Sequence, residues 1–303
     1  MDRRQFLASG AAFGASTLAA SHGLAQGKPL KIGILNDLST IYADYQGVGS
    51  KIAADMAIAD WSAKLGVPAE TIISDHQNKP DIGSGIARKW IDQEGVDVIM
   101  DLPGSPVALA VLAVANEKNK AVIASGAGSS IMTGPQCSKN FVHWTYDTYA
   151  LGHALGDAMT KEGAKTWYFI TVDNAFGKDL EQNCADAVVA AGGKVLGAAR
   201  HPLATSDFSS FLLQAQASGA EVVAFANAGG DLNQSLKQAA EFGLMKKQKA
   251  AALILNVTNI PSLGQAAVEG IKISTGFYWD QNDGTRAFAK RFQEKHPSKM
   301  MPN

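Results

Sequence analysis

The sequence predicts an α/β protein made of two doubly wound lobes, each a parallel β-sheet covered by helices on both faces. Two observations, joined by one rule of protein architecture, lead to this fold class. Short apolar runs that suit buried strands alternate with longer stretches that suit helices. Strands and helices that alternate in this way form parallel sheets. The alternation starts again near residues 140–150, so we expect one sheet before this point and another after it.

The first run of elements begins with KIGILND at Lys31–Asp37, an apolar stretch that suits a buried strand. At Gly47–Lys64, apolar residues recur between charged residues, which indicates a helix. Pro80 is expected to open a helix that runs through Ile91, because proline suits the first helical turn. The same patterns predict strands at Glu70–Ser74, Val96–Asp101 and Ala121–Ala124, and a helix at Val107–Glu117.

The second run repeats the pattern, with TWYFIT at Thr166–Thr171 as a buried strand. Asp207 is expected to cap a helix that ends at Ala217, because a short polar side chain can accept from free backbone N–H groups. The other expected elements are helices at Thr148–Glu162, Gly177–Ala191, Leu232–Phe242 and Thr285–Lys295, and strands at Lys194–Ala199, Glu221–Ala226, Ala251–Leu255 and Gly270–Gly276.

The N-terminal segment has the features of an export signal. Arg3 and Arg4 precede an uncharged run of small and apolar residues that ends at Ala25. The apolar run from Phe6 to Ala20 is shorter than the roughly 20 residues that a membrane-spanning helix needs. We therefore predict a twin-arginine signal peptide at residues 1–25 and a location outside the cytoplasm.

Composition and motifs exclude several function classes. The 27 basic and 28 acidic residues leave a formal net charge of -1, which disfavours nucleic acid as a partner. Cys137 and Cys184 belong to no CxxC motif and have no His or Cys at metal-ligand spacing, so we predict no metal site, while a disulfide between them stays open. The chain also lacks GxSxG, GxxxxGK[ST] and HExxH motifs, so we predict no cofactor and no catalytic residues.

The loops after the strands carry the candidate binding site, because ligands of doubly wound sheets bind beyond the carboxyl ends of the strands. These loops combine hydroxyl groups, glycine-rich turns and aromatic rings. Each loop alone is also explained as an ordinary turn. Together they suit a ligand with a carboxylate end, which free N–H groups bind, and a flat or apolar end. The candidate residues are Tyr45, Ser105, Gly126, Ala127, Gly128, Ser129, Phe176, Asn227 and Asn256.

In their order and spacing, several segments resemble the periplasmic solute-binding proteins of branched-chain-amino-acid-type ABC transporters, of the leucine/isoleucine/valine-binding kind. These segments are KIGILNDLS, DHQNKPD, VDVIMDLPGSPVALAV, AVIASGAGSS, HWTYDTYALG, VDNAFGKDL and FYWD. The resemblance implies a type I periplasmic binding fold, a clamshell hinged by crossover segments. It also implies a monomer that delivers a small ligand to an inner-membrane ABC permease. The implied lobes are residues 28–143 plus 280–303 for lobe 1 and residues 144–276 for lobe 2.

The resemblance also assigns roles to the candidate residues. Ser105 and the turn at Gly126–Ser129 are expected to hold the ligand carboxylate, and Tyr45 and Phe176 to line the pocket. Members of the family usually continue past the final KMMPN, so we expect a C-terminal truncation.

Two departures from the family pattern bear on the ligand. Amino-acid binders place a hydroxyl where this chain has Gly128, and an acidic residue near the loop at Asn256–Asn259, which is neutral here. A buried ammonium without a partner is costly, so we favour an aromatic or other organic acid. Asp173 or Asp231 could still pair with an amine, so an amino acid stays open. The aromatic residues that favour an aromatic acid are Tyr42, Tyr45, Trp144, Tyr146, Tyr278 and Trp279.

An exported α/β enzyme acting on a small carboxylate is the alternative function. The twin-arginine route carries folded proteins, and two α/β lobes with a cleft also describe many enzymes.

Overall fold

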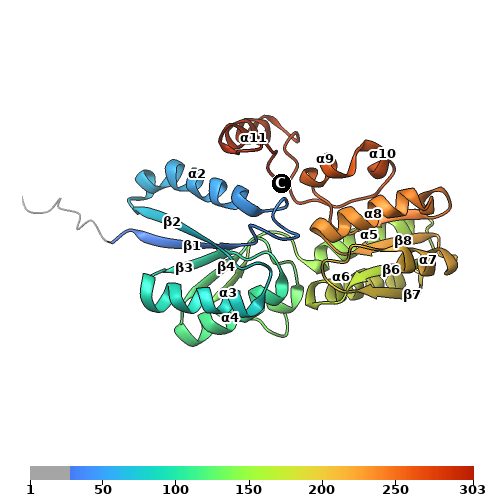
Figure 1. The fold of residues 1–303 in the computed structure, drawn as a ribbon, viewed down its shortest axis with the longest axis horizontal. Helices are drawn as coiled ribbons and strands as arrows, with labels where there is room; N and C mark the ends of the chain where they lie inside the picture. Colours follow the sequence, from blue (N-terminus) through green and yellow to red (C-terminus); the bar gives the residue numbers. More distant parts are fainter. Residues whose placement is uncertain (1–27) are drawn as a thin grey trace, which may run out of the picture.

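Two separate parallel sheets divide the chain in the computed structural model, which describes residues 28–303 (Figure 1). The first sheet has five strands in the order β2-β1-β3-β4-β5, and the second has four in the order β7-β6-β8-β9. All neighbouring strands run parallel. The predicted two-lobed α/β architecture is therefore confirmed. The predicted signal at residues 1–25 lies outside the described residues.

The first sheet lies between α2 on one face and α3 and α4 on the other (Figure 1). Its central strands are short and apolar, and Leu35, Ile99 and Val122 have no exposed surface. The strands are β1 (Leu30–Asn36), β2 (Ala69–Asp75), β3 (Val98–Asp101), β4 (Ala121–Ala124) and β5 (Phe141–His143). The helices are α2 (Gly47–Leu65), α3 (Pro80–Lys89), which continues as a π-helical turn η1 (Trp90–Glu94), and α4 (Ser105–Lys118).

The second sheet separates two hydrophobic clusters. Successive residues of β6 alternate between them, with Trp167 and Phe169 in one cluster and Tyr168 and Ile170 in the other. The first cluster is completed by α5 and α6 and the second by α7 and α8, so helices cover both faces. The elements are α5 (Thr148–Lys161), β6 (Thr166–Val172), α6 (Ala175–Ala190), β7 (Lys194–His201), α7 (Ser209–Ala217), β8 (Val222–Ala226), α8 (Gly229–Glu241) and β9 (Lys249–Ala252).

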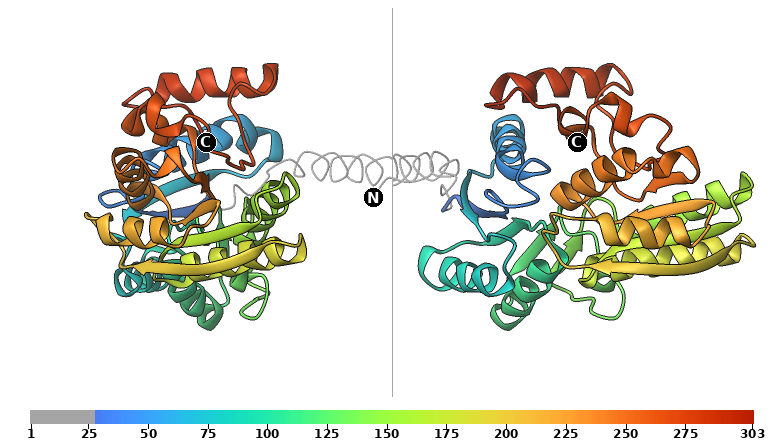
Figure 2. Two further views of the ribbon diagram at one scale, coloured as in Figure 1. Left: turned by 90° about the vertical axis from the view of Figure 1, so that its right-hand side faces the viewer. Right: turned by 45° about the vertical axis from the view of Figure 1, so that its right-hand side comes forward.

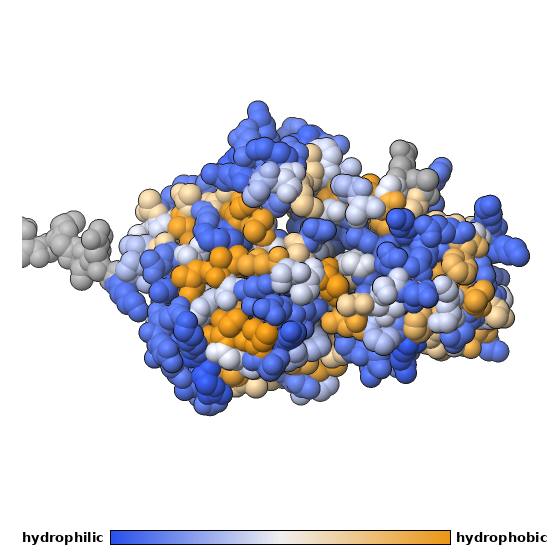
Figure 3. Space-filling view, in the orientation of Figure 1, coloured by the Kyte–Doolittle hydropathy of each residue, from blue (hydrophilic) through white to orange (hydrophobic). Residues whose placement is uncertain are grey.

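The last helix returns to the first lobe. After the short helices α9 (Ile260–Leu263) and α10 (Gln265–Val268), the chain crosses back and forms α11 (Asp283–Lys295) beside α2 (Figures 1 and 2). The ion pair between Arg291 and Asp60, at 2.7 Å, joins the two helices. Hydrophilic residues dominate the visible surface of α11 (Figure 3).

Three local predictions differ from the structure. Strand β5 was not predicted, because three residues are too few to show an alternating pattern. The strand predicted at Gly270–Gly276 is wrong, since only Lys272 forms a bridge to the sheet, at Ala251. The cap of α7 is Phe208 rather than Asp207, although Asp207 still accepts a hydrogen bond from the Ser209 N–H at 2.9 Å.

The two cysteines are both free thiols. Cys137 is exposed, whereas Cys184 is buried in the cluster beneath α5 and α6. Burial raises the pKa of the Cys184 thiol to about 12, so it stays protonated and unreactive.

Candidate functional site

A cavity of about 20 Å³ lies between the carboxyl ends of the two sheets, with walls from both lobes. One wall comes from the loops that follow β1, β3 and β4, and the other from the segments that follow β6, β8 and β9. This is the position at which doubly wound sheets bind ligands. The lining residues are Tyr42, Tyr45, Pro103, Gly104, Ser105, Gly126, Gly128, Tyr146, Phe176, Ala228 and Ile254.

Ser105 forms the polar end of the cavity. It is the first residue of α4, a helix of 14 residues, so the positive end of the helix dipole meets the cavity there. The Ser105 hydroxyl oxygen accepts a hydrogen bond from the Ser129 N–H at 3.0 Å. This bond leaves the Ser105 proton free to donate, which suits an anionic group in the cavity.

The turn at Ser125–Ser129 supplies further donors. The four successive carbonyl oxygens of Ser125–Gly128 contact hydrogen-bonding groups of residues 143–148, from the end of β5 to the start of α5. The pairs are Ser125 O with Thr145 Oγ1 at 2.9 Å, Gly126 O with Tyr146 OH at 3.0 Å, Ala127 O with His143 Nε2 at 2.7 Å, and Gly128 O with Thr148 N at 2.8 Å. The N–H groups of Ala127 and Gly128, by contrast, have no acceptor within residues 28–303. The turn is thus held rigidly while two donors stay available for an anion.

Aromatic rings form the other end of the cavity. Tyr42 and Tyr45 come from the first lobe, Tyr146 from the crossover and Phe176 from α6. Burial raises the pKa of Tyr45 to about 12 and that of Tyr42 still further, so both phenols are neutral. The Tyr45 and Tyr146 hydroxyls are hydrogen-bonded to each other. This end suits a flat or apolar group with room for hydrogen bonding at its edge.

No acidic side chain is among the residues that line this cavity. Asp231 accepts a hydrogen bond from the Ala204 N–H at 3.1 Å, and burial raises the pKa of Asp231 to about 6. Asp173 is exposed and paired with Lys178 at 2.7 Å. Neither carboxylate that could have paired with a ligand amine therefore lies in the cavity.

The structure brings most of the predicted site residues together. Tyr45, Ser105, Gly126, Gly128 and Phe176 line the cavity, and Ala127 and Ser129 belong to the turn beside it. Two predicted residues lie elsewhere. Asn227 is buried inside the second lobe, where its Nδ2 contacts His201 Nε2 at 3.1 Å and Ser235 Oγ at 3.3 Å, and Asn256 lines a neighbouring cavity.

Residues outside the predicted set also line the cavity. Tyr42 lies three residues before Tyr45 in the same loop, so its aromatic ring was a usable signal. Tyr146 lies three residues after β5, a strand that the sequence did not predict, so strand-end reasoning did not place it in the site, although its ring was among those that favoured an aromatic acid. Trp144 and Tyr278 are exposed and do not line this cavity.

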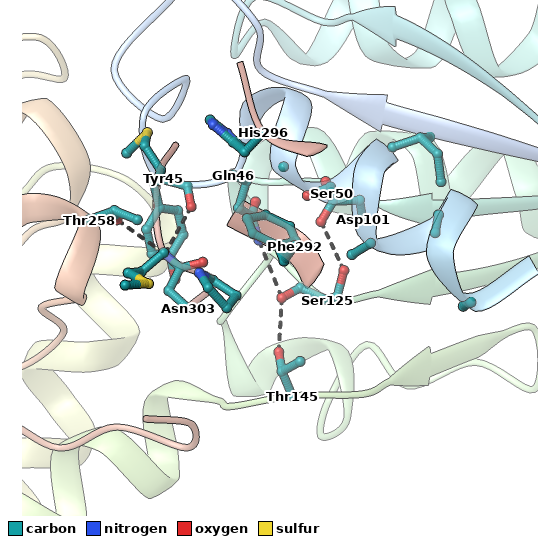
Figure 4. A pocket seen from close by; sticks show the side chains of 18 of the residues that line it. Tyr45, Gln46, Ser50, Asp101, Ser125, Thr145, Thr258, Phe292, His296 and Asn303 are labelled. Carbon is teal, nitrogen blue, oxygen red and sulfur yellow. Dashed lines mark hydrogen bonds between the residues drawn. The ribbon is translucent and has the colours of Figure 1, made fainter. Parts of the chain in front are cut away.

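Two larger cavities lie beside the crossover segments. One of about 350 Å³ lies beneath α11 and contains buried Asp101, which accepts a hydrogen bond from Ser125 Oγ at 2.8 Å (Figure 4). Burial raises the pKa of Asp101 to about 6. The other, of about 570 Å³, lies between the crossover segments at Trp144–Tyr146 and Ser274–Phe277. We assign the site to the small cavity because it alone of the three is lined by both Ser105 and the Gly128 turn.

Within the described residues, every helix is too short or too polar to cross a membrane. The same residues form no group of three or more His, Cys, Asp or Glu side chains placed to hold a metal ion.

A family model described as "Periplasmic binding protein" matches residues 29–303. A similar curated protein is the Leu/Ile/Val-binding protein homolog 6 of Brucella abortus (strain 2308), 28% identical over 246 residues. The alignment covers 79% of this chain and 62% of that protein, so the chain spans less than two thirds of the length of this relative.

Solved structures share the fold over nearly all of the described chain. A periplasmic binding protein from Burkholderia mallei is 46% identical with a TM-score of 0.87, covering 90% of this chain and 73% of its own. A branched chain amino acid ABC transporter periplasmic ligand-binding protein from Burkholderia xenovorans LB400 is 36% identical with a TM-score of 0.77, with the same coverage of 90% and 73%. An ABC transporter solute-binding protein from R. palustris in complex with benzoate is 25% identical with a TM-score of 0.82, covering 91% and 76%.

Proposed function

Because the chain belongs to the periplasmic binding protein family, we propose that it is the solute-binding protein of an ABC importer and that its ligand is a small aromatic or apolar carboxylate without an ammonium group. The observation that carries this proposal is the composition of the small cavity. Its polar end offers the Ser105 hydroxyl and the Gly128 N–H, with the free N–H of Ala127 in the turn beside it, and its other walls are largely aromatic. These groups match a carboxylate at one end and a ring at the other.

The missing acidic side chain argues against an α-amino acid. An ammonium group buried in this cavity would lose its water without gaining a carboxylate partner, which costs several kcal/mol in a closed site. The R. palustris relative, solved in complex with benzoate, supports an aromatic acid. The description of the B. xenovorans relative supports a branched-chain amino acid as the second candidate.

Binding on this proposal works by closure of the two lobes. A cavity of about 20 Å³ accommodates roughly one water molecule. A benzoate-sized ligand therefore needs the lobes to separate for entry, and the lining side chains to lie farther apart when the lobes close around it. Such a ligand would contact Ser105 of the first lobe and Phe176 and Ala228 of the second. Because both sets of contacts exist only when the lobes are together, the ligand shifts the population toward the closed form.

The proposed setting is the periplasm. The predicted twin-arginine signal would deliver the folded protein there, and an inner-membrane ABC permease would receive the ligand from the monomeric closed form. The family is one of binding proteins, which favours this function over the exported enzyme considered from the sequence. No covalent step is required.

Isothermal titration tests the ligand class. The protein is first unfolded and refolded to remove co-purified ligand, and is then titrated with benzoate, 4-hydroxybenzoate, leucine and, as an uncharged control, benzamide. We expect binding of a benzoate, at least tenfold weaker binding of benzamide, and a similar loss for benzoate in Ser105→Ala, each equivalent to about 1.4 kcal/mol. Binding of leucine alone would refute the aromatic-acid assignment and support the second candidate.

A further inference from the structure

The loop between β1 and α2 reaches across from the first lobe to the start of α8 in the second. The N–H of Gly230 donates a hydrogen bond to the carbonyl oxygen of Ile41 at 2.9 Å. The Ile41 side chain packs against a hydrophobic cluster made largely of second-lobe residues. The two lobes therefore meet directly, through main chain, at a place well separated in sequence from the crossovers.

This bond replaces a cap that α8 lacks. The first N–H groups of any helix have no partner within the helix and are usually bonded by a polar residue at the N-cap. The N-cap of α8 is Ala228, which has no side chain that can accept. The carbonyl oxygen of Ile41 supplies the acceptor from the other lobe.

Only a glycine at position 229 allows the two backbones to come this close. Gly229 has φ +57, and a Cβ built on it would lie 2.3 Å from the Ile41 carbonyl oxygen and 2.8 Å from Cδ1 of Tyr42. Both distances are far inside normal van der Waals contact. Any other residue at position 229 would push the Ile41 loop away.

The loop that makes this contact also carries part of the cavity wall. Asp37 holds the loop by accepting hydrogen bonds from the Thr40 N–H at 2.8 Å and the Tyr42 N–H at 3.1 Å. Tyr42, the next residue after Ile41, lines the cavity. A displacement of Ile41 therefore moves the Tyr42 ring.

We propose that Gly229, Gly230 and the Ile41 carbonyl form a positioning contact that seats the Tyr42 wall over the ligand when the lobes close. Neither glycine lines the cavity, so the contact acts through Tyr42 and not by touching the ligand. The proposal rests on the function proposed above, in which the ligand occupies this cavity.

A pair of glycine substitutions tests the effect on binding. Gly229→Ala adds both the strain of a positive φ and the clash with Ile41. Gly219→Ala adds only the strain, because Gly219 has φ +66 and no atom of the described chain lies within 4 Å of its Cβ position. We expect Gly229→Ala to lose at least as much folding stability as Gly219→Ala, and only Gly229→Ala to bind benzoate at least tenfold more weakly. Equal affinities for the two variants would overturn the proposal.

A disulfide tests the contact without relying on any ligand. The Cβ position of Gly230 lies 3.4 Å from Ile41 Cβ, close to the separation of about 3.8 Å found across disulfides. In a Cys137→Ser background, the double variant Ile41→Cys with Gly230→Cys should form a disulfide in oxidised glutathione. Small-angle scattering should then show a compact protein, and bound benzoate should exchange with free benzoate only after the disulfide is reduced. Failure to crosslink would overturn the contact. A crosslink in a protein whose parent binds none of the acids would uphold the contact and refute only the ligand class.

Discussion

Asp179 on α6 offers the most informative single perturbation, because it ties the second lobe to the turn that carries the free N–H groups. One of its carboxylate oxygens accepts from Ser129 Oγ at 2.8 Å, from the Ser130 N–H at 2.7 Å and Oγ at 3.0 Å, and from Thr148 Oγ1. Within residues 28–303, Asp179 forms no ion pair, so hydrogen bonds alone hold it. Asp179→Ala removes the common acceptor of all these donors.

The magnitude follows from the exposure of the donors. A hydrogen bond to a charged group contributes about 1.5–3 kcal/mol to stability, and a buried donor that loses its partner keeps its full desolvation penalty. Ser130 is only half-buried, so water can replace its lost bonds, whereas Ser129 and Thr148 are both buried. About two bonds are then uncompensated, and we expect Asp179→Ala to lower the free energy of unfolding by roughly 4 kcal/mol.

Urea unfolding of the wild type and the variant measures this loss, and titration with benzoate measures its effect on the turn. We expect benzoate affinity to fall several-fold, because Ser129 also donates to Ser105. Asp186→Ala is the matched control, since Asp186 lies on the same helix, is exposed, and among residues 28–303 accepts only from Gln182, at 2.8 Å. A loss of stability no larger than that of Asp186→Ala would refute the reasoning.

Three further predictions address the cavity, the pH dependence and the last helix. In Gly128→Ala, the new Cβ would lie 2.9 Å from the Phe176 ring, so titration should show at least tenfold weaker binding of benzoate with little change in melting temperature. The folded-state pKa of Asp101 is raised to about 6, so between about pH 4 and 6 the folded protein keeps a proton that the unfolded chain releases. The free energy of unfolding should therefore fall as the pH rises from about 4 to 6. Urea titrations at several pH values should show this slope in the wild type and a flatter slope in Asp101→Asn. Phe292→Ala should lower the free energy of unfolding in urea by about 3 kcal/mol, because the ring is buried between α11 and α2. Arg291→Ala should lower it by under about 1 kcal/mol, because the ion pair with Asp60 is exposed. Equal losses for the two variants would contradict this ranking.

The fold was predictable because local patterns determine it. Parallel strands buried on both faces need continuous apolar runs, and the helices between them need one apolar face, so both leave a mark in the sequence. The two misjudged strands show where this fails. Phe141–His143 is too short to carry a pattern, and Gly270–Gly276 is apolar in places but meets the sheet only at Lys272.

The candidate site was predictable in part for a topological reason. The carboxyl ends of parallel strands meet at one edge, so loops distant in sequence, such as those of Ser105 and Gly128, converge in the cavity without any knowledge of the packing. Asn227 also follows the carboxyl end of a strand, but its side-chain amide points into the second lobe and contacts His201 instead of lining the cavity.

By itself, therefore, the sequence determined the two-lobed architecture and the chemistry of the loops, since both depend on residue type and order along the chain. Only the tertiary structure decided how the lobes meet. It brought Tyr146 of the crossover against Tyr45, removed Asp231 from the cavity, and placed Gly230 against the Ile41 carbonyl. These contacts join residues more than 100 positions apart or depend on side-chain direction, and no local pattern encodes either.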